Sequence, residues 1–270
     1  MTKNIPEQIL EAYLSGSYFH YNKKCTLRIS NEGLIISQYT PMGYITDLED
    51  ENGRYQSFMI LTMQNFKSQP NWEKQKMQLA HAANKQDIMV LFVPMIDIFT
   101  GYENADEYSN KYGSNETSSS DNFYDLVFKD LIKVAKYSQD QDLKTAAVAY
   151  IDNDCALHQT LFSYNQLLSG EFKHAEEVVC QYCQSMRSLP NCFITLLEPC
   201  IDCLKHMIDL GAEEVYFGQT HKVKWNTTEF IEYTNSIFNK SIKSYRNRPI
   251  AFKKIANKKV EAFYKPKEAK

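Results

Sequence analysis

The stretch Phe193-Ile194-Thr195-Leu196-Leu197-Glu198-Pro199-Cys200-Ile201-Asp202-Cys203 (residues 193–203) decides the fold of this chain. Its apolar first half is typical of a buried strand. Pro199 suits the first turn of a following helix, where its missing N–H is not needed. Cys200 and Cys203 then lie on one face at the helix start, where the positive end of the helix favours thiolates. The stretch therefore predicts a strand that runs through Pro-Cys-x-x-Cys into a helix.

A second motif, His174-Ala175-Glu176, lies upstream of this stretch. One imidazole and two thiolates, from His174, Cys200 and Cys203, are suitable ligands for a tetrahedral Zn²⁺ ion. Three protein ligands are typical of a catalytic site, which keeps its fourth position open for water. Glu176 is a poor fourth ligand because it is so close to His174, but it is well placed to move protons. The alternative, two core cysteines and an unrelated histidine, does not account for the strand-to-helix context of the motif.

These residues form an H-x-E…P-C-x-x-C arrangement, which resembles the cytidine and deoxycytidylate deaminase superfamily of zinc enzymes. Residues 197–200 and 215–218 are most similar to the branch that holds tRNA adenosine deaminases, guanine deaminases and fungal cytosine deaminases. The resemblance implies that a zinc-bound hydroxide attacks C4 of a cytosine or C6 of an adenine. Glu176 would accept the water proton, deliver it to the ring nitrogen and help ammonia to leave.

The resemblance also implies substrate-binding residues. Asn165 falls at the end of the second expected strand, where that branch has an asparagine that binds the substrate near the scissile ring. The alternative is a strand-end turn, which asparagine favours without any ligand. Ala175 is the other expected substrate contact. The chain departs from the branch by an extra residue between Thr195 and Glu198, and it lacks an Arg-Asp pair after Gly218. The base and its carrier therefore stay open.

The periodicity around the motifs predicts a helix, two strands, a helix, a strand, a helix and a strand, in that order. We expect an α/β fold: a three-layer cytidine-deaminase-like domain at 122–239, with a mixed sheet flanked by helices. A smaller α+β domain of unknown role at 1–102 precedes it, and a polar linker at 103–121 joins the two. Residues 240–270 are expected as a basic C-terminal tail. In the smaller domain we expect an amphipathic segment at 9–14, a helical stretch at 72–84 and strands at 25–29, 34–39, 58–63 and 88–93.

Some further patterns have both a functional and a structural interpretation. Residues 91–98 and His81 echo the two motifs, as a decayed duplicate domain would, but they are too close together and would hold no zinc.

Cys180-x-x-Cys183 suggests a second metal site or a redox pair, yet helical rise puts Cys180 roughly 9 Å along the axis from His174. Core packing is therefore favoured for both cysteines. Ordinary roles are expected for His20, His158 and His221. We expect His206 next to the metal ligands or on the surface, and Trp225 as a pocket wall or as part of the core.

The composition is that of an ordinary globular protein, with 270 residues, 43% hydrophobic and 23% charged. The start of the chain lacks the apolar run of a signal peptide, and no segment approaches membrane-spanning length. An odd number of cysteines, seven, suits a reducing compartment better than a disulfide framework. We therefore expect a cytoplasmic protein with no membrane partner, and we expect it to be a homo-oligomer.

The segment 240–270 has eleven Lys or Arg against two Glu, a local charge of +9, with aromatic residues interleaved. Such a segment can follow a phosphate backbone and stack bases, or it can be a solvated tail. The favoured function is a zinc-dependent hydrolytic deaminase of a cytosine- or adenine-type base, free, in a nucleotide or in RNA. The alternative is a non-catalytic, zinc-stabilised interaction module on the same fold, which would have no need of Glu176.

Overall fold

A computed structural model describes residues 4–17, 27–38, 40–50, 52–64, 71–94, 120–140, 143–151, 160–220, 228–244 and 246–265. These segments form one ten-stranded sheet, in the order β1-β2-β3-β4-β5-β7-β6-β10-β11-β12, and a separate β8-β9 hairpin. The strands are β1 (Leu27–Ile29), β2 (Leu34–Ser37), β3 (Thr40–Glu49), β4 (Tyr55–Thr62), β5 (Met89–Val93), β6 (Ala146–Ile151), β7 (Thr160–Tyr164), β8 (Gln166–Leu168), β9 (Glu171–Lys173), β10 (Pro190–Leu197), β11 (Glu214–Gln219) and β12 (Ala251–Lys254). The helices are α1 (Ile5–Leu14), α2 (Trp72–Lys85), α4 (Ser120–Ala135), α5 (Ala175–Ser185), α6 (Ile201–Asp209), α7 (Thr228–Phe238) and α8 (Lys258–Phe263). In these segments no helix is both long and apolar enough to cross a bilayer.

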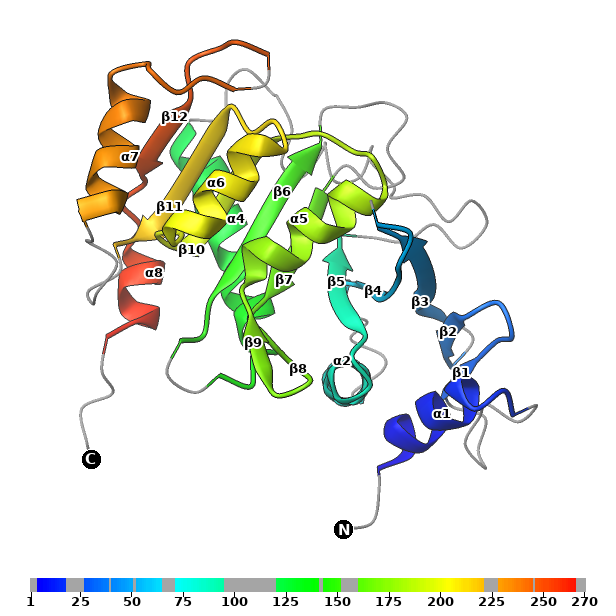
Figure 1. The fold of residues 1–270 in the computed structure, drawn as a ribbon. Coiled ribbons are helices and arrows are strands. Elements are labelled where there is room, and N and C mark those ends of the chain that lie inside the picture. Colours follow the sequence, from blue (N-terminus) through cyan, green and yellow to red (C-terminus); the bar gives the residue numbers. More distant parts are fainter. Residues whose placement is uncertain are drawn as a thin grey trace.

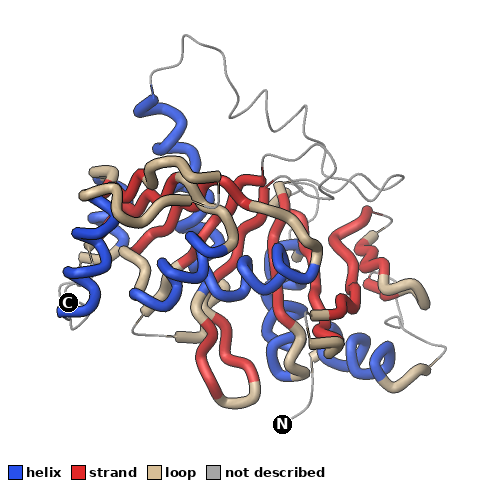
Figure 2. The backbone as a smooth tube through the Cα atoms, turned by 45° about the horizontal axis from the view of Figure 1, so that its top comes forward, coloured by secondary structure: helices blue, strands red, loops and turns tan. Residues whose placement is uncertain are grey.

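Helices cover both faces of the sheet, with α5 and α6 in front of the strands and α4 behind them in Figure 1. The buried side chains of α5, α6 and α7 pack into a core cluster on one face, and those of α1, α2, α4 and α8 pack into a cluster on the other. Figure 2 shows the strands side by side across the molecule, with the helices against them. The expected α/β class with a mixed sheet flanked by helices is confirmed.

The second half of the chain has the expected order of elements around the motifs. Strands β6 and β7 are antiparallel, β10 is antiparallel to β6, and β11 runs parallel to β10 and to β12. The hairpin β8-β9 between β7 and α5 was absent from the expected order. This hairpin connects Asn165, at the end of β7, to His174, at the start of α5.

Strand β3 is the largest difference from the elements expected in the first half. Pro41 and Gly43 interrupt its sequence pattern and conceal it, because both residues are uncommon inside strands. Gly43 is required by a close approach of β4, since a Cβ at this position would lie 2.1 Å from the carbonyl oxygen of Ile60. The other expected strands and the helix at 72–84 are present within a few residues of their expected bounds.

Strands β1 to β5 continue the same sheet and meet the second half at β5 and β7. The antiparallel pairing there is limited to Phe92 and Phe162. The side chain of Gln166 completes the contact: its amide nitrogen donates to the carbonyl oxygen of Val90 at 2.6 Å, and its amide oxygen accepts the N–H of Val90 at 2.8 Å. Residues 103–119 of the expected linker lie outside the described segments, so the domain boundary stays a prediction.

The basic segment 240–270 contributes β12 and α8 to the fold. Strand β12 is an edge of the sheet, and its Lys253 and Lys254 are exposed. Charged lysines on an edge strand prevent pairing with another chain. Arg248 forms an ion pair with Glu213 at 3.1 Å, so part of the local charge is neutralised within the molecule. Arg248, Lys253 and Lys254 therefore have structural roles whether or not they also bind a partner.

Candidate metal centre and active site

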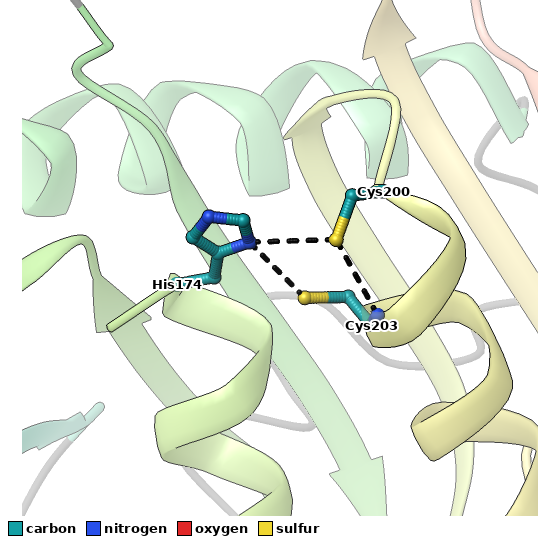
Figure 3. A group of neighbouring side chains, drawn as sticks. All are labelled: His174, Cys200 and Cys203. Atoms are coloured by element: carbon teal, nitrogen blue, oxygen red, sulfur yellow. Dashed lines mark hydrogen bonds between the residues drawn. The ribbon is translucent and has the colours of Figure 1, made fainter. Parts of the chain in front are cut away.

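The side chains of His174, Cys200 and Cys203 meet between the starts of α5 and α6 (Figure 3). His174 Nδ1 lies 3.3 Å from the Cys203 sulfur and 3.5 Å from the Cys200 sulfur. Their possible ligand atoms all lie within 4.8 Å of one another, and no other cluster of this kind is found in the described part of the chain. The structure thus brings together the three residues that the sequence predicts as ligands.

Helix starts position all three side chains. His174 and Cys200 are the N-cap residues of α5 and α6, and Cys203 lies in the first turn of α6. The backbone N–H of Cys203 donates to the Cys200 sulfur at 3.5 Å. Pro199 precedes the N-cap, so the expectation that it lies in the first helical turn is wrong. Because the proline stands outside the helix, the sulfur of Cys200 takes the capping role.

The electrostatics of the cluster favour a thiolate. The pKa of Cys200 is lowered to about 4, chiefly because the Cys203 thiol donates a hydrogen bond to it, and His174 lowers it further. The bond to Cys200 in turn raises the pKa of His174 to about 9. Imidazole nitrogen and thiolate sulfur are the donors that Zn²⁺ prefers in proteins. The donor set therefore fits Zn²⁺, with the Nδ1 atom and the two sulfurs as its ligands.

Glu176 lies in the first turn of α5 and is only 4% exposed. Burial raises the pKa of its carboxyl to about 7, whereas the nearby His174 acts in the opposite direction. The neighbouring Glu177 is partly exposed and forms an ion pair with Lys173 at 2.7 Å. Of the two adjacent carboxyls, Glu176 alone faces the cleft beside the metal cluster. A carboxyl with a pKa near neutrality can both accept and donate a proton there.

A small cleft opens beside the cluster. It is lined by Leu143, Thr145, Asn165, His174, Glu176, Leu197, Glu198, Pro199 and Cys200. No local sequence signal marks Leu143 and Thr145, because they stand in a connection before β6 and reach the cleft only through the fold. Glu198 was visible in the motif but had no role assigned to it.

The expected substrate residues lie close to each other. Asn165 lines the cleft and is 1% exposed, and its side-chain nitrogen donates to the carbonyl oxygen of Leu143 at 3.0 Å. Its side-chain oxygen accepts the backbone N–H of Ala175 at 3.0 Å. Ala175 is fully buried and is not among the described residues that line the cleft. Asn165 thus ties the end of β7 to the start of α5, and substrate contact stays a prediction for both residues.

The other candidates from the sequence lie away from this centre. Cys180 and Cys183 are fully buried in the core, where burial raises the pKa of both thiols, in agreement with the expected core packing. His81 Nε2 lies 3.0 Å from the carbonyl oxygen of Tyr137, and His206 lies in the last turn of α6. The remaining candidates, His20, His158, His221 and Trp225, lie outside the described residues.

Residues 122–219 match the cytidine and deoxycytidylate deaminase zinc-binding region. Solved structures with similar chains include dCMP deaminase from the cyanophage S-TIM5 in complex with dCMP and dUMP. That chain is 14% identical, with a TM-score of 0.36, over 51% of this chain and 100% of its own. The apo form is 15% identical, with a TM-score of 0.31, over 48% of this chain and 98% of its own. A comparison with curated protein sequences found no match.

The assignment to a family rests on the matched region and on the ligand geometry within it. The region contains both helix starts, the three converging ligand side chains and the buried Glu176. The donor set and the matched region both indicate zinc as the metal. Residues 122–219 of this chain therefore belong to the cytidine and deoxycytidylate deaminase superfamily.

Proposed function

We propose that this protein is a zinc-dependent hydrolase that deaminates a cytosine- or adenine-type nucleobase and releases ammonia. One observation carries the proposal: the buried carboxyl of Glu176 lines the same cleft as His174 and Cys200. A structural zinc site closes with four protein ligands and has no need of a buried proton carrier. Among the described residues the ligand cluster has only His174, Cys200 and Cys203 as members, which favours a centre that admits water.

The chemistry of the proposed reaction depends on Glu176. Zn²⁺, when bound, supplies a Lewis acid that lowers the pKa of water toward neutrality. Glu176 accepts a proton from water in the cleft and delivers it to the ring nitrogen of the substrate. The oxygen of that water forms a bond to the ring carbon, and the carboxyl then moves the remaining proton from the new hydroxyl to the amine. The C–N bond breaks, ammonia departs and a carbonyl group is left on the ring. A carboxyl with a pKa of about 7 suits both transfers at one pH.

Asn165 is our candidate for substrate binding. An asparagine amide has two N–H donors, and one of them is used on the carbonyl oxygen of Leu143. The second donor can bind an acceptor on a substrate while the first keeps the side chain in place. Such a fixed amide orients a ring without losing side-chain freedom when the substrate binds.

The carrier of the base is the open part of the proposal. None of the described residues that line the cleft is Lys or Arg, and two of them, Glu176 and Glu198, are acidic. This lining suits an amino-substituted ring, and a phosphate group would be bound farther out. RNA contact through the basic segment 240–270 is a proposal for that outer part, with the exposed Lys253 and Lys254 of β12 as candidates.

The test is an ammonia-release screen across bases, nucleosides, nucleotides, tRNA and single-stranded DNA. Removal of residues 240–270 would take away β12 and α8, so the charge is better removed by Lys253→Gln with Lys254→Gln. If RNA is the substrate, binding should weaken steeply with salt, and the double variant should bind less tightly. Equal RNA turnover by the double variant would contradict an RNA role for β12. Failure to release ammonia from every substrate would overturn the proposed function.

A further inference from the structure

Residues 143–145, which we call the cleft wall, are held from two sides. From one side, the side-chain nitrogen of Asn165 donates to the carbonyl oxygen of Leu143 at 3.0 Å. From the other side, the hydroxyl of Tyr264 donates to the carbonyl oxygen of Lys144 at 2.8 Å. The first and last residues of the cleft wall line the cleft. A shift of this short segment would therefore change the shape of the cleft.

Tyr264 directly follows α8, and α8 is fixed to α4 and β11. Asn257 caps α8, and its side-chain nitrogen donates to Asp125 of α4 at 2.6 Å. Val260 packs tightly on Gly218 of β11, where an added Cβ would lie 2.9 Å from a Val260 methyl group. The place of Tyr264 is thus set by Asp125 of α4 and Gly218 of β11, which both lie within the matched region 122–219.

Tyr264 contacts the cleft wall without lining the cleft itself. It is not among the described residues that line the cleft, although it is close enough to Glu176 for the carboxylate charge to affect it. Burial is the main cause that raises the pKa of Tyr264, and the charge of Glu176 raises it further. The hydroxyl therefore keeps its proton at neutral pH and serves as a donor to Lys144.

We propose that Tyr264 is a positioning residue whose hydroxyl fixes the cleft wall, which makes the segment 246–265 part of the catalytic unit. The proposal rests on the deaminase function proposed above. From the cleft wall the hydrogen bonds continue to Asn165 and on to the N–H of Ala175 at the start of α5. Ala175 stands between His174 and Glu176 in the sequence. Tyr264 therefore supports the helix start that carries a zinc ligand and the proton carrier.

The variant Tyr264→Phe tests this role, with Tyr137→Phe as a matched control. Tyr137→Phe likewise loses one hydroxyl bond, to the carboxylate of Glu73 of α2 at 2.6 Å, and Tyr137 is not among the described residues that line the cleft. We expect Tyr264→Phe to lower kcat/KM roughly tenfold, with a raised KM and unchanged zinc content, because small displacements of positioning groups have effects of this order. A merely structural defect would reduce the number of active molecules and leave KM unchanged, as we expect for Tyr137→Phe.

Hydrogen exchange gives a readout that does not depend on turnover. We expect amides at residues 143–151 to exchange faster in Tyr264→Phe than in the wild type, and to be unchanged in Tyr137→Phe. An unaltered KM together with unaltered exchange in Tyr264→Phe would overturn the inference. If the wild type releases no ammonia from any substrate, the proposed function fails, and the exchange experiment still decides whether Tyr264 fixes the cleft wall.

Discussion

At the scale of single residues, α5 carries two adjacent carboxyls with different surroundings. Glu176 is buried beside the metal cluster, whereas Glu177 is partly exposed and paired with Lys173. We expect Glu176→Gln to lower kcat by about 10²–10⁴-fold, because the amide cannot carry the proton, and to leave the zinc content unchanged. The control Glu177→Gln should keep most of the activity. The rate of ammonia release and the zinc content of each variant test this prediction. Wild-type turnover in Glu176→Gln would contradict the proposed mechanism.

Two pairs of cysteines in this chain share the same spacing but not the same surroundings. Cys203 belongs to the metal cluster, whereas Cys183 of α5 is packed in the hydrophobic core of the molecule. We expect Cys203→Ala to lose the zinc and lower the melting temperature, because binding free energy is part of the folding free energy. Cys183→Ala should retain about one zinc per chain. Equal zinc content in the two variants would exclude Cys203 as a ligand.

Lys76 of α2 is a buried lysine, with 1% exposure. Its ammonium group donates to the carbonyl oxygens of Thr62 at 3.0 Å and Gln64 at 3.3 Å, and it lies 3.4 Å from Glu73. Burial lowers its pKa from 10.5 to about 8, against the opposing effect of Glu73. The lysine thus joins α2 to the end of β4.

This shift of pKa predicts a pH dependence of stability. Between pH 8 and 10.5 the unfolded chain binds more protons at Lys76 than the folded chain, so the free energy of unfolding rises with pH. Across this window we expect the wild type to gain on the order of 2 kcal/mol relative to Lys76→Met, measured by urea unfolding. The exposed Lys74 on the same helix is the control, and Lys74→Met should follow the wild type. A constant difference between wild type and Lys76→Met would contradict the prediction.

At the scale of elements, the contact between β5 and β7 depends on Gln166. Its amide bonds both backbone groups of Val90 and accepts a further bond from Asn84 at 2.8 Å. We expect Gln166→Leu to lower the free energy of unfolding by about 2–4 kcal/mol, because it leaves several buried polar groups unsatisfied. The exposed Gln86 at the end of α2 provides a control, with an expected change for Gln86→Leu within about 0.5 kcal/mol. Similar unfolding curves for both variants would show that this amide is dispensable.

At the scale of the whole molecule, the two halves of the chain share one sheet and one covering helix. Helix α5 packs on β3 and β5 as well as on β6 and β7, and the Tyr182 ring meets Phe58 of β4 at 5.2 Å. The helix that carries the zinc ligand and the proton carrier is therefore buried partly by the first half of the chain. This packing favours a single cooperative unit.

Cooperativity can be tested with one probe in each half. The chain has two tryptophans, so Trp225→Phe leaves the buried Trp72 of α2 as the probe of the first half. Zinc release reports on the second half. We expect both signals to change at the same urea concentration, as a two-state transition requires. A Trp72 transition at lower urea, before zinc is released, would show that the first half unfolds by itself as a separate domain.

The sequence by itself determined which three side chains form the metal cluster. His174, Cys200 and Cys203 were predictable because each ligand is fixed by a short-range rule: a helix start after an apolar strand, and a spacing within one helical turn. The core role of Cys180 and Cys183 followed from helical rise in the same way. The α/β class and the order of elements around the motifs were also readable, since hydrophobic periodicity reports local structure.

Only the tertiary structure decided what surrounds the centre. Strand β3 was not predictable from the sequence because its Gly43 is uncommon inside strands. The glycine is needed there because β4 approaches closely, and this contact is known only from the fold. Sequence periodicity likewise contains no signal that Gln166 would join the halves or that the hydroxyl of Tyr264 would reach Lys144. Such contacts depend on which strands become neighbours and which side chains then meet across them. The pairing of strands and the burial of polar groups are properties of the packed molecule, and local patterns do not encode them.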